Sequence, residues 1–255
     1  MVTAARALEM RLSLSCVATE LPYDLGEMPE LYRSLRDHKP VAFLESREGT
    51  EKYARYGIAA ARPLLTVHGQ GSTYVIKDDS GRAVTVDSRD PLDLLRSLQP
   101  GVRVPDTLDG YRYTAGWVGS LGYEVSELFE GIPRAQVDDL SLPDTIFYLP
   151  SVVILKDASA RRLTLVCAER SDVSARQLMD EVSTFLTSQV PIKAPVLNGQ
   201  ERTARTSFPE ADFLSAVTQS RRLIHDGELI QVVVSRRWEI DEAPEPEAVY
   251  GALSD

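Results

Sequence analysis

Apolar and polar residues follow two different periods along this chain, and each period predicts a different kind of element. Apolar residues three and four positions apart predict helices at residues 25–36, 90–98, 173–186 and 207–226. Alternation interrupted by turns predicts strands at residues 41–46, 64–68, 73–77, 82–86, 146–155 and 163–168. The many short strands and few helices predict an α+β fold, in which residues 41–86 and 113–168 form two packed antiparallel sheets with helices outside.

The last predicted helix leads into a strand with a misplaced polar residue. Ser207 and Glu210 have capping-box spacing, and Gly227 stands where a helix-ending glycine is expected. Residues 229–240 then read as a strand that places Gln231 among aliphatic side chains. A buried amide without a partner costs about 1–3 kcal/mol. Gln231 therefore either meets a partner in a pocket or is exposed, and the general behaviour of polar residues favours exposure.

The charge balance limits the kinds of partner. With 38 acidic and 28 basic residues, the formal net charge is −10, and no cluster of lysine and arginine interrupts this acidity. Such a chain repels nucleic acids and anionic membranes, and no window reaches the ~18 apolar residues of a membrane span. We therefore expect neither partner. A small anionic substrate would need positive charge or a metal ion at its own site.

Cysteine and histidine are too scattered to form a metal site. Cys16 and Cys167 are far apart, and His38, His68 and His225 do not stand at ligand spacing from them or from one another. These spacings do not fit zinc. Free thiols suit a reducing compartment, so we expect a cytoplasmic protein.

The run Gly-Glu-Leu-Ile-Gln-Val-Val-Val-Ser-Arg-Arg at residues 227–237 resembles the opening of the chorismate-binding domain in the anthranilate synthase component I family. In relatives that add water to chorismate, a lysine acting as general base occupies the position of Gln231. A glutamine cannot accept a proton at neutral pH. The resemblance therefore points to the amine-adding branch, which comprises anthranilate synthase and aminodeoxychorismate synthase, and makes Gln231 a substrate-pocket candidate.

Two further runs resemble landmarks of the same family in the same order. Residues 115–124 resemble its Gly-Gly-x-Val-Gly-x-Leu-Gly-Tyr-Asp run, with Ala115 replacing the first glycine and Glu124 the acid. Phe129-Glu130 and Leu142-Pro143-Asp144 follow where the family has Phe-Glu and Leu-Pro-Asp. We interpret the glycines at positions 116, 119 and 122 as structural, because strand glycines mark close backbone approach.

The strand end Leu44-Glu45-Ser46 and the loop after it, residues 47–52, resemble the N-terminal signature of the family. The resemblance implies that Ser46 belongs to a site where tryptophan binds as a feedback inhibitor, and that Arg55 lies near a basic residue of that site. The alternative is that Glu45 and Ser46 only end a strand and begin a turn, as polar residues often do.

The resemblance extends over only the N-terminal half of the family. It implies an N-terminal regulatory region at residues 1–190, a linker at residues 191–206, and the start of the chorismate-binding catalytic domain at residues 207–255. The implied fold is that of anthranilate and aminodeoxychorismate synthases, incomplete at the C-terminus. The family's catalytic residues and Mg²⁺ ligands have no counterparts in this chain. We therefore name no catalytic or metal-binding residue, and expect the 255-residue chain to be inactive alone.

The implied activity is that of a carbon–oxygen lyase in tryptophan biosynthesis. Such an enzyme converts chorismate and ammonia, or glutamine through an amidotransferase subunit called component II, into anthranilate and pyruvate with Mg²⁺. L-Tryptophan is the implied inhibitor. Two alternatives remain open: aminodeoxychorismate synthase component I of the folate pathway, and a non-catalytic module that binds tryptophan or a partner subunit.

Overall fold

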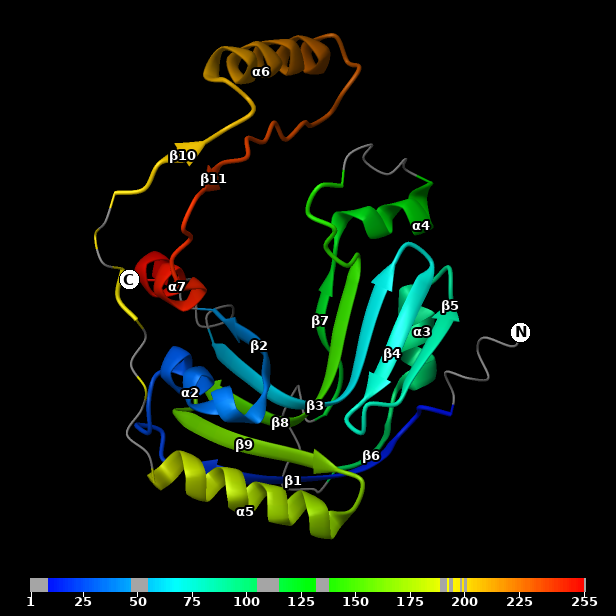
Figure 1. Cartoon of the computed structure of the whole chain (residues 1–255), viewed down its shortest axis with the longest axis vertical. Helices are drawn as coiled ribbons and strands as arrows, with labels where there is room; N and C mark the ends of the chain where they lie inside the picture. The colour runs from blue at the N-terminus through cyan, green and yellow to red at the C-terminus, as the bar shows by residue number, and fades with distance from the viewer. Residues whose placement is uncertain are drawn as a thin grey trace. The chain divides into compact units, whose positions relative to one another are not determined.

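The chain forms two compact units, Met1–Lys193 and Ala194–Asp255. The computed structural model describes residues 9–46, 55–104, 115–131, 138–188 and 201–254, together with residues 192, 195–197 and 199. The N-terminal unit contains a large sheet flanked by helices, and the C-terminal unit contains a small two-stranded sheet and two helices (Figure 1). The predicted α+β class is confirmed.

The large sheet has nine strands, and β3 and β8 pair along most of their length at its centre. The continuous order is β5-β4-β3-β8-β9-β1-β6, with β2 added to β3 and β7 added to β8. Every pair is antiparallel except β1 with β6. The strands are β1 (Ser13–Leu21), β2 (Pro40–Glu45), β3 (Tyr56–Gln70), β4 (Thr73–Asp78), β5 (Ala83–Asp87), β6 (Gly101–Arg103), β7 (Val118–Leu121), β8 (Thr145–Asp157) and β9 (Arg162–Glu169).

An irregularity in the middle of β3 divides the sheet into two arms. The register with β8 shifts between Pro63 and Leu65, and Arg62 just before it has a left-handed φ of 57°. Here β3 exchanges its partner β2 for β4, while β8 exchanges β9 for β7. Ser151 Oγ donates a hydrogen bond of 2.9 Å to the Arg62 carbonyl and fixes this break. The strands predicted for two sheets are therefore two arms of one continuous sheet.

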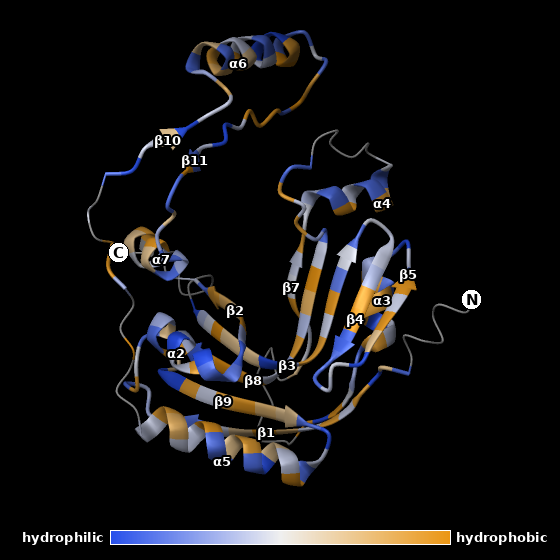
Figure 2. Cartoon of the chain, viewed as in Figure 1, coloured by the Kyte–Doolittle hydropathy of each residue, from blue (hydrophilic) through white to orange (hydrophobic). Residues whose placement is uncertain are grey.

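The first arm, which contains β2, β9, β1 and β6, carries α2 (Met28–Ser34) and α5 (Asp172–Ser188) on one face. Its strands are rich in apolar residues (Figure 2). Because successive side chains point to opposite faces, one apolar set meets both helices and the other forms a separate cluster. Burial of the set under the helices, at roughly 25 cal/mol per Å² of apolar surface, is the main force that holds the helices to the sheet. Its most buried members are Leu35, Ala59, Ala61, Val152, Ile154, Leu165, Cys167, Ala175 and Val182.

The second arm, which contains β4, β5 and β7, packs against α3 (Pro91–Leu98). The Asp90 carboxylate caps this helix by accepting hydrogen bonds from the backbone N–H groups of Leu92 and Asp93, at 2.8 and 3.1 Å. Pro91 occupies the first turn, where its missing N–H costs nothing. The predicted helix at residues 90–98 is confirmed. Its leucines meet strand residues in a cluster that includes Leu65, Val67, Tyr74, Ile76, Leu94, Leu95 and Leu98.

Several predicted elements have different limits in the structure. The helix expected at residues 25–36 divides into α2 and a 3₁₀ turn, η1 (Leu35–His38). Strand β3 starts earlier than the predicted strand at residues 64–68. The sequence prediction missed β1, β6, a 3₁₀ turn, η3 (Tyr123–Val125), and a short helix, α4 (Ser126–Glu130). The predicted loop at residues 47–52 lies outside the described residues.

In the C-terminal unit, α6 (Glu210–His225) ends as predicted and begins differently. Gly227 has φ 77°, its N–H donates to the Ile224 carbonyl, and the next N–H donates to the Leu223 carbonyl, which is the Schellman arrangement. The capping box at Ser207 is wrong, because Pro209 is the N-cap residue and no side chain caps it.

The strand predicted at residues 229–240 is also wrong for most of its length. Only β11 (Glu239–Ile240) is paired, with β10 (Ala204–Arg205), and a helix, α7 (Pro246–Ser254), follows it. No strand among the described residues pairs with residues 229–238. Alternation favours an extended backbone, whereas a strand also needs a neighbour that accepts its hydrogen bonds. Ile230 is consequently 99% exposed and Val233 80%.

Both cysteines are buried, free thiols on opposite faces of the first arm. Burial raises the pKa of Cys16 to about 11 and that of Cys167 to about 12. Since the thiolate is the reactive form, we expect both thiols in the folded protein to react with a disulfide reagent at least ~100-fold more slowly than free cysteine at pH 8. The rate at which the reagent releases its coloured thiolate, followed in native buffer and in urea, measures this difference. Equal rates in the two conditions would contradict it.

Candidate functional site

A small pocket lies at one end of the first arm, where three adjacent strands place Glu45, Gly57 and Lys156 side by side. Glu45 of β2 pairs with Gly57 of β3, and Gly57 pairs with Lys156 of β8. Directly paired residues point to the same face of a sheet, so the two charged side chains flank a position that has no side chain. We call this cavity, of about 210 Å³, the strand-end pocket. Its lining residues are Tyr23, Glu27, Met28, Glu45, Ser46, Arg55, Tyr56, Gly57, Lys156 and Ala158.

Gly57 is required by the close approach of α2. A Cβ atom built on Gly57 would lie 2.6 Å from Met28 Cγ, and Met28 itself is only 1% exposed. The next residues on the same face, Phe43, Ala59 and Ile154, belong to or pack against the apolar cluster under α2. The pocket is therefore the polar end of a face that is otherwise apolar.

The two residues predicted for a tryptophan site both line this pocket. Ser46 directly follows β2, and its N–H donates a hydrogen bond of 3.3 Å to the Tyr56 carbonyl. Arg55 directly precedes β3, and its carbonyl accepts from the Ala158 N–H at 2.9 Å. The pairing of β2, β3 and β8 thus brings together residues from the two ends of the predicted loop. Tryptophan binding by Ser46 and Arg55 remains a prediction.

The Arg55 guanidinium is held by Asp157 in a two-pronged ion pair. Arg55 Nε donates to Asp157 Oδ1 at 2.9 Å, and Nη2 donates to Oδ2 at 2.7 Å. Arg55 also lies over the Tyr56 ring, 4.8 Å from its centre. Hydrogen bonding to Arg55 lowers the pKa of the Asp157 carboxyl below its usual value.

This ion pair leads to a prediction about pH. A carboxyl with a depressed folded pKa stabilises the fold above its unfolded pKa of ~3.9, and the contribution is lost as pH falls through the folded pKa. Asp157→Asn should therefore lower the free energy of unfolding between about pH 5 and 7, and the difference from the parent should shrink toward about pH 2–3. Urea unfolding at several pH values measures it. A difference that stays constant with pH would refute the assignment.

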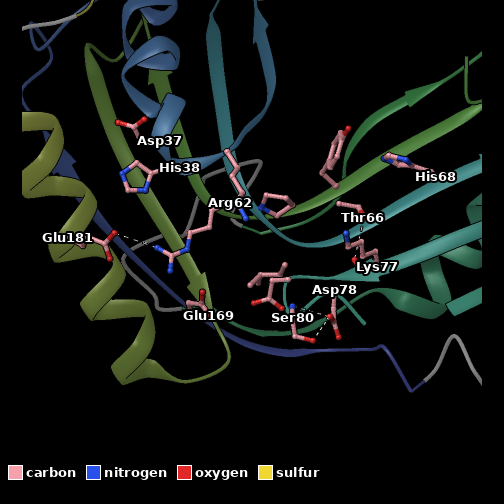
Figure 3. Close-up of a pocket in the computed structure, with 16 residues that line it drawn as sticks. Asp37, His38, Arg62, Thr66, His68, Lys77, Asp78, Ser80, Glu169 and Glu181 are labelled. Carbon is pink, nitrogen blue, oxygen red and sulfur yellow. Dashed lines mark hydrogen bonds and ion pairs between the residues drawn. The ribbon is translucent and has the colours of Figure 1, made fainter. Parts of the chain in front are cut away.

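A larger groove, of about 820 Å³, lies where the sheet bends (Figure 3). Three of its acidic side chains have partners: Asp79 pairs with Arg170, Glu181 lies 3.6 Å from Arg62, and Asp78 accepts hydrogen bonds from its own turn. Figure 3 shows Arg62 pointing along the groove toward Glu181. Several of the groove's charges are thus paired within the protein, and we assign it no ligand.

The other sequence landmarks meet at a structural junction in the second arm. The buried Asp144 accepts a hydrogen bond of 2.6 Å from the Gly71 N–H, and its carbonyl accepts one of 2.6 Å from the Gly122 N–H. A Cβ atom on Gly119 would lie 2.0 Å from the Ile146 carbonyl oxygen. These contacts agree with a structural role for this run.

Gln231 is exposed and lines none of these cavities. It remains a substrate-pocket candidate only by resemblance. Among the described residues, no three carboxylate, imidazole or thiol groups come together as metal ligands. No helix in the described ranges is both long and apolar enough to cross a membrane.

Lys156, Tyr23 and Glu27 line the strand-end pocket but were not identified from the sequence. The available signal was a lysine inside the predicted apolar hairpin, where a buried cation needs a partner. The neighbours of Lys156 cannot be read from the alternation of apolar and polar residues, because they depend on strand register. The register of β3 against β8 places Lys156 beside Gly57, and Gly57 in turn pairs with Glu45.

The comparisons with known proteins define a class. The sequence profile of the chorismate binding enzymes matches residues 39–255, and the chain belongs to this family. The anthranilate synthase component 1 of Cereibacter sphaeroides is 30% identical over 251 residues, and that of Acetivibrio thermocellus is 24% identical over 252 residues. Each alignment covers 93% of this chain and 50% of the relative. The chain therefore spans about half the length of these curated relatives.

A solved structure supports the fold. The crystal structure of anthranilate synthase component I from Streptococcus pneumoniae superposes with a TM-score of 0.61 at 21% identity. The match covers 84% of this chain and 47% of that one. The fold of this chain is thus similar to part of that protein.

Proposed function

We propose that this chain supplies the N-terminal part of an anthranilate synthase component I. The observation that carries the proposal is the similarity to relatives of that name along 93% of the chain. The complete enzyme would act on chorismate and ammonia, supplied directly or by a glutamine amidotransferase subunit, and release anthranilate and pyruvate. Gln231 supports amine rather than water addition, because a neutral amide hydrogen-bonds to a substrate and does not deprotonate water.

The described residues of this chain do not account for the whole reaction. Mg²⁺ would neutralise a chorismate carboxylate and orient the leaving group, but these residues form no cluster that fits a metal ion. We therefore assign no step of the reaction to Mg²⁺ at any residue of this chain. Its proposed contribution is the strand-end pocket and the segment that carries Gln231.

An activity measurement tests the proposal. The purified chain is mixed with chorismate, ammonium and Mg²⁺, alone and together with the separately expressed C-terminal half of the Cereibacter sphaeroides relative. We expect no anthranilate fluorescence from the chain alone and measurable fluorescence from the mixture. If the two halves are folded and bind each other but form no product, the proposal is contradicted.

The same experiment distinguishes the two alternative functions, aminodeoxychorismate synthase and a non-catalytic module. Aminodeoxychorismate synthase fits the amide at Gln231 equally well, and its product retains the pyruvyl ether, so chromatography of the products distinguishes the two. A non-catalytic module is favoured by one observation: the strand-end pocket lies entirely within the N-terminal unit. Tryptophan binding without activity in any mixture would support that alternative.

Replacement of Gln231 by lysine should change the chemistry of the completed enzyme. Lysine introduces a base and a positive charge at the position where water-adding relatives carry their general base. We expect anthranilate formation by Gln231→Lys to fall by about 100-fold, the usual scale for a misplaced acid–base group, with some isochorismate formed. Product analysis by chromatography measures both. Kinetics unchanged from the parent would make Gln231 an exposed structural residue.

We further propose that the strand-end pocket binds L-tryptophan and thereby inhibits the enzyme. The support is the meeting of Ser46, Arg55 and Glu45 around a cavity of about 210 Å³. Calorimetric titration of the 255-residue chain with tryptophan tests this directly. Absence of binding at millimolar tryptophan would remove the regulatory part of the proposal.

A further inference from the structure

We infer that Lys156, and not Arg55, is the main cation for a ligand carboxylate in the strand-end pocket. The inference rests on the proposal that this pocket binds an amino acid, and it names a residue that determines ligand specificity. The ligand class is an α-amino acid with a free carboxylate and an aromatic side chain.

Lys156 has one N–H donor that no described residue accepts. Its Nζ donates to Glu27 Oε2 at 2.9 Å and to the Gly26 carbonyl at 3.1 Å. An ammonium group has three N–H donors, so one remains. The side chain is 10% exposed, and it lines the pocket. Its third donor therefore has the pocket as its available polar environment.

Arg55 is a poorer candidate for the same task. Its Nε and Nη2 atoms are engaged by both oxygens of Asp157, whose side chain is only 14% exposed. A two-pronged pair of this kind fixes the guanidinium plane and offsets its charge. The Arg55 guanidinium keeps unused N–H groups, but its charge is already offset by the half-enclosed carboxylate of Asp157, so it attracts a second carboxylate less strongly.

The partner on Lys156 is also easier to displace. The Glu27 side chain is 74% exposed, and a charge pair with one partner in water is weakened by solvent. Tyr23 adds an aromatic ring 5.1 Å from Lys156 Nζ, which holds the cation without neutralising it. Lys156 thus keeps net positive character toward the pocket.

The strand register also places a carboxylate on the same face as Lys156. Glu45 and Lys156 are separated by Gly57, so their Cα atoms lie two strand spacings, roughly 10 Å, apart on one face. Both side chains line the pocket, so its wall carries a cation and a carboxylate. The Ser46 hydroxyl at the end of β2 can donate or accept beside them.

Paired ligands test the inference on the intact 255-residue chain. L-Tryptophan and L-tryptophanamide differ in the ligand carboxylate, and calorimetry gives the ratio of their dissociation constants. We expect the parent to prefer tryptophan by roughly ten- to a hundredfold, the range for a hydrogen bond to a charged group. Lys156→Met should reduce this preference to less than about threefold, and Lys156→Arg should restore part of it. Arg221→Gln, which removes an exposed charge on α6, is the matched control and should keep the parent ratio.

The outcomes separate this inference from the proposed function. A parent that binds neither ligand overturns both. A parent that binds tryptophan, with the preference intact in folded Lys156→Met, overturns the role of Lys156 and leaves the pocket. Circular dichroism verifies folding of each variant.

A second variant decides the matter if Lys156→Met does not fold. Glu27→Gln keeps an oxygen that can cap α2 and removes the carboxylate that competes for Lys156. The preference for tryptophan should then rise above that of the parent. A ratio equal to or below the parent value would overturn the inference.

Discussion

Gly119→Ala is expected to lower the free energy of unfolding of the N-terminal unit by about 3 kcal/mol or more, above the usual range for overpacking. A Cβ atom at this position would lie 2.0 Å from the Ile146 carbonyl oxygen and 2.7 Å from Phe147 Cα. Both atoms belong to the backbone of β8, so no rotation of a side chain can relieve the overlap. Strand β7 must separate from β8, which breaks its pairing with residues Thr145 to Tyr148.

Urea unfolding followed by circular dichroism measures the loss, and Gly101→Ala provides the control. A Cβ atom on Gly101 would have only Ser13 Oγ nearby, at 3.9 Å, which is an ordinary contact distance. That strand-edge variant should change the free energy of unfolding by less than about 1 kcal/mol. Equal midpoints for the two variants would show that β7 can shift without cost.

Ser46→Ala should weaken tryptophan binding by about ten- to more than a hundredfold, the effect of removing one hydrogen bond to a charged ligand group. The hydroxyl stands at the end of β2 beside Glu45, and it can donate to a carboxylate or accept from an ammonium group. Ser46 is exposed and forms no side-chain hydrogen bond in the described structure, so its removal should leave folding unchanged. The effect should therefore be confined to the ligand.

Titration of the parent and of Ser46→Ala with tryptophan gives the ratio of dissociation constants. In the completed enzyme, the inhibition constant should rise by a similar factor while uninhibited turnover stays normal. If inhibition acts through affinity, tryptophan and chorismate must weaken each other's binding equally. Identical tryptophan affinities in parent and variant would exclude Ser46 from the site.

The hairpin and meander strands could be predicted because their signals are local. Alternating side chains with turns such as Asp78 to Gly81 fix both the strand type and the direction of the next strand. In contrast, β1 was missed because it mixes serine, threonine and small residues. Its apolar positions serve two different clusters, with Cys16 on one face and Val17 on the other. The burial of such a strand on both faces becomes clear only when the elements packed against each face are known.

The segment after Gly227 has the sequence pattern of a strand but does not form one. Its alternation is strong, yet residues 229–238 form no ladder, because pairing depends on a neighbour and not on the segment itself. The candidate site was predicted in the same partial way. Ser46 and Arg55 came from resemblance, whereas Lys156 emerges only from the register that aligns it with Gly57 and Glu45.

The pairing of β3 with β8 through both arms determines how the N-terminal unit unfolds. Because β3 and β8 each cross both arms, neither arm can detach without breaking hydrogen bonds that also hold the other. Amide hydrogens of Ala59 to Ala61 and Val152 to Ile154 should exchange with solvent only through global opening, at a rate that reports the stability of the whole unit. Those of β5 and β6, which each pair with a single strand among the described residues, should exchange earlier by fraying. The N-terminal unit should therefore unfold in one cooperative step in spite of the three separate apolar clusters among its described residues.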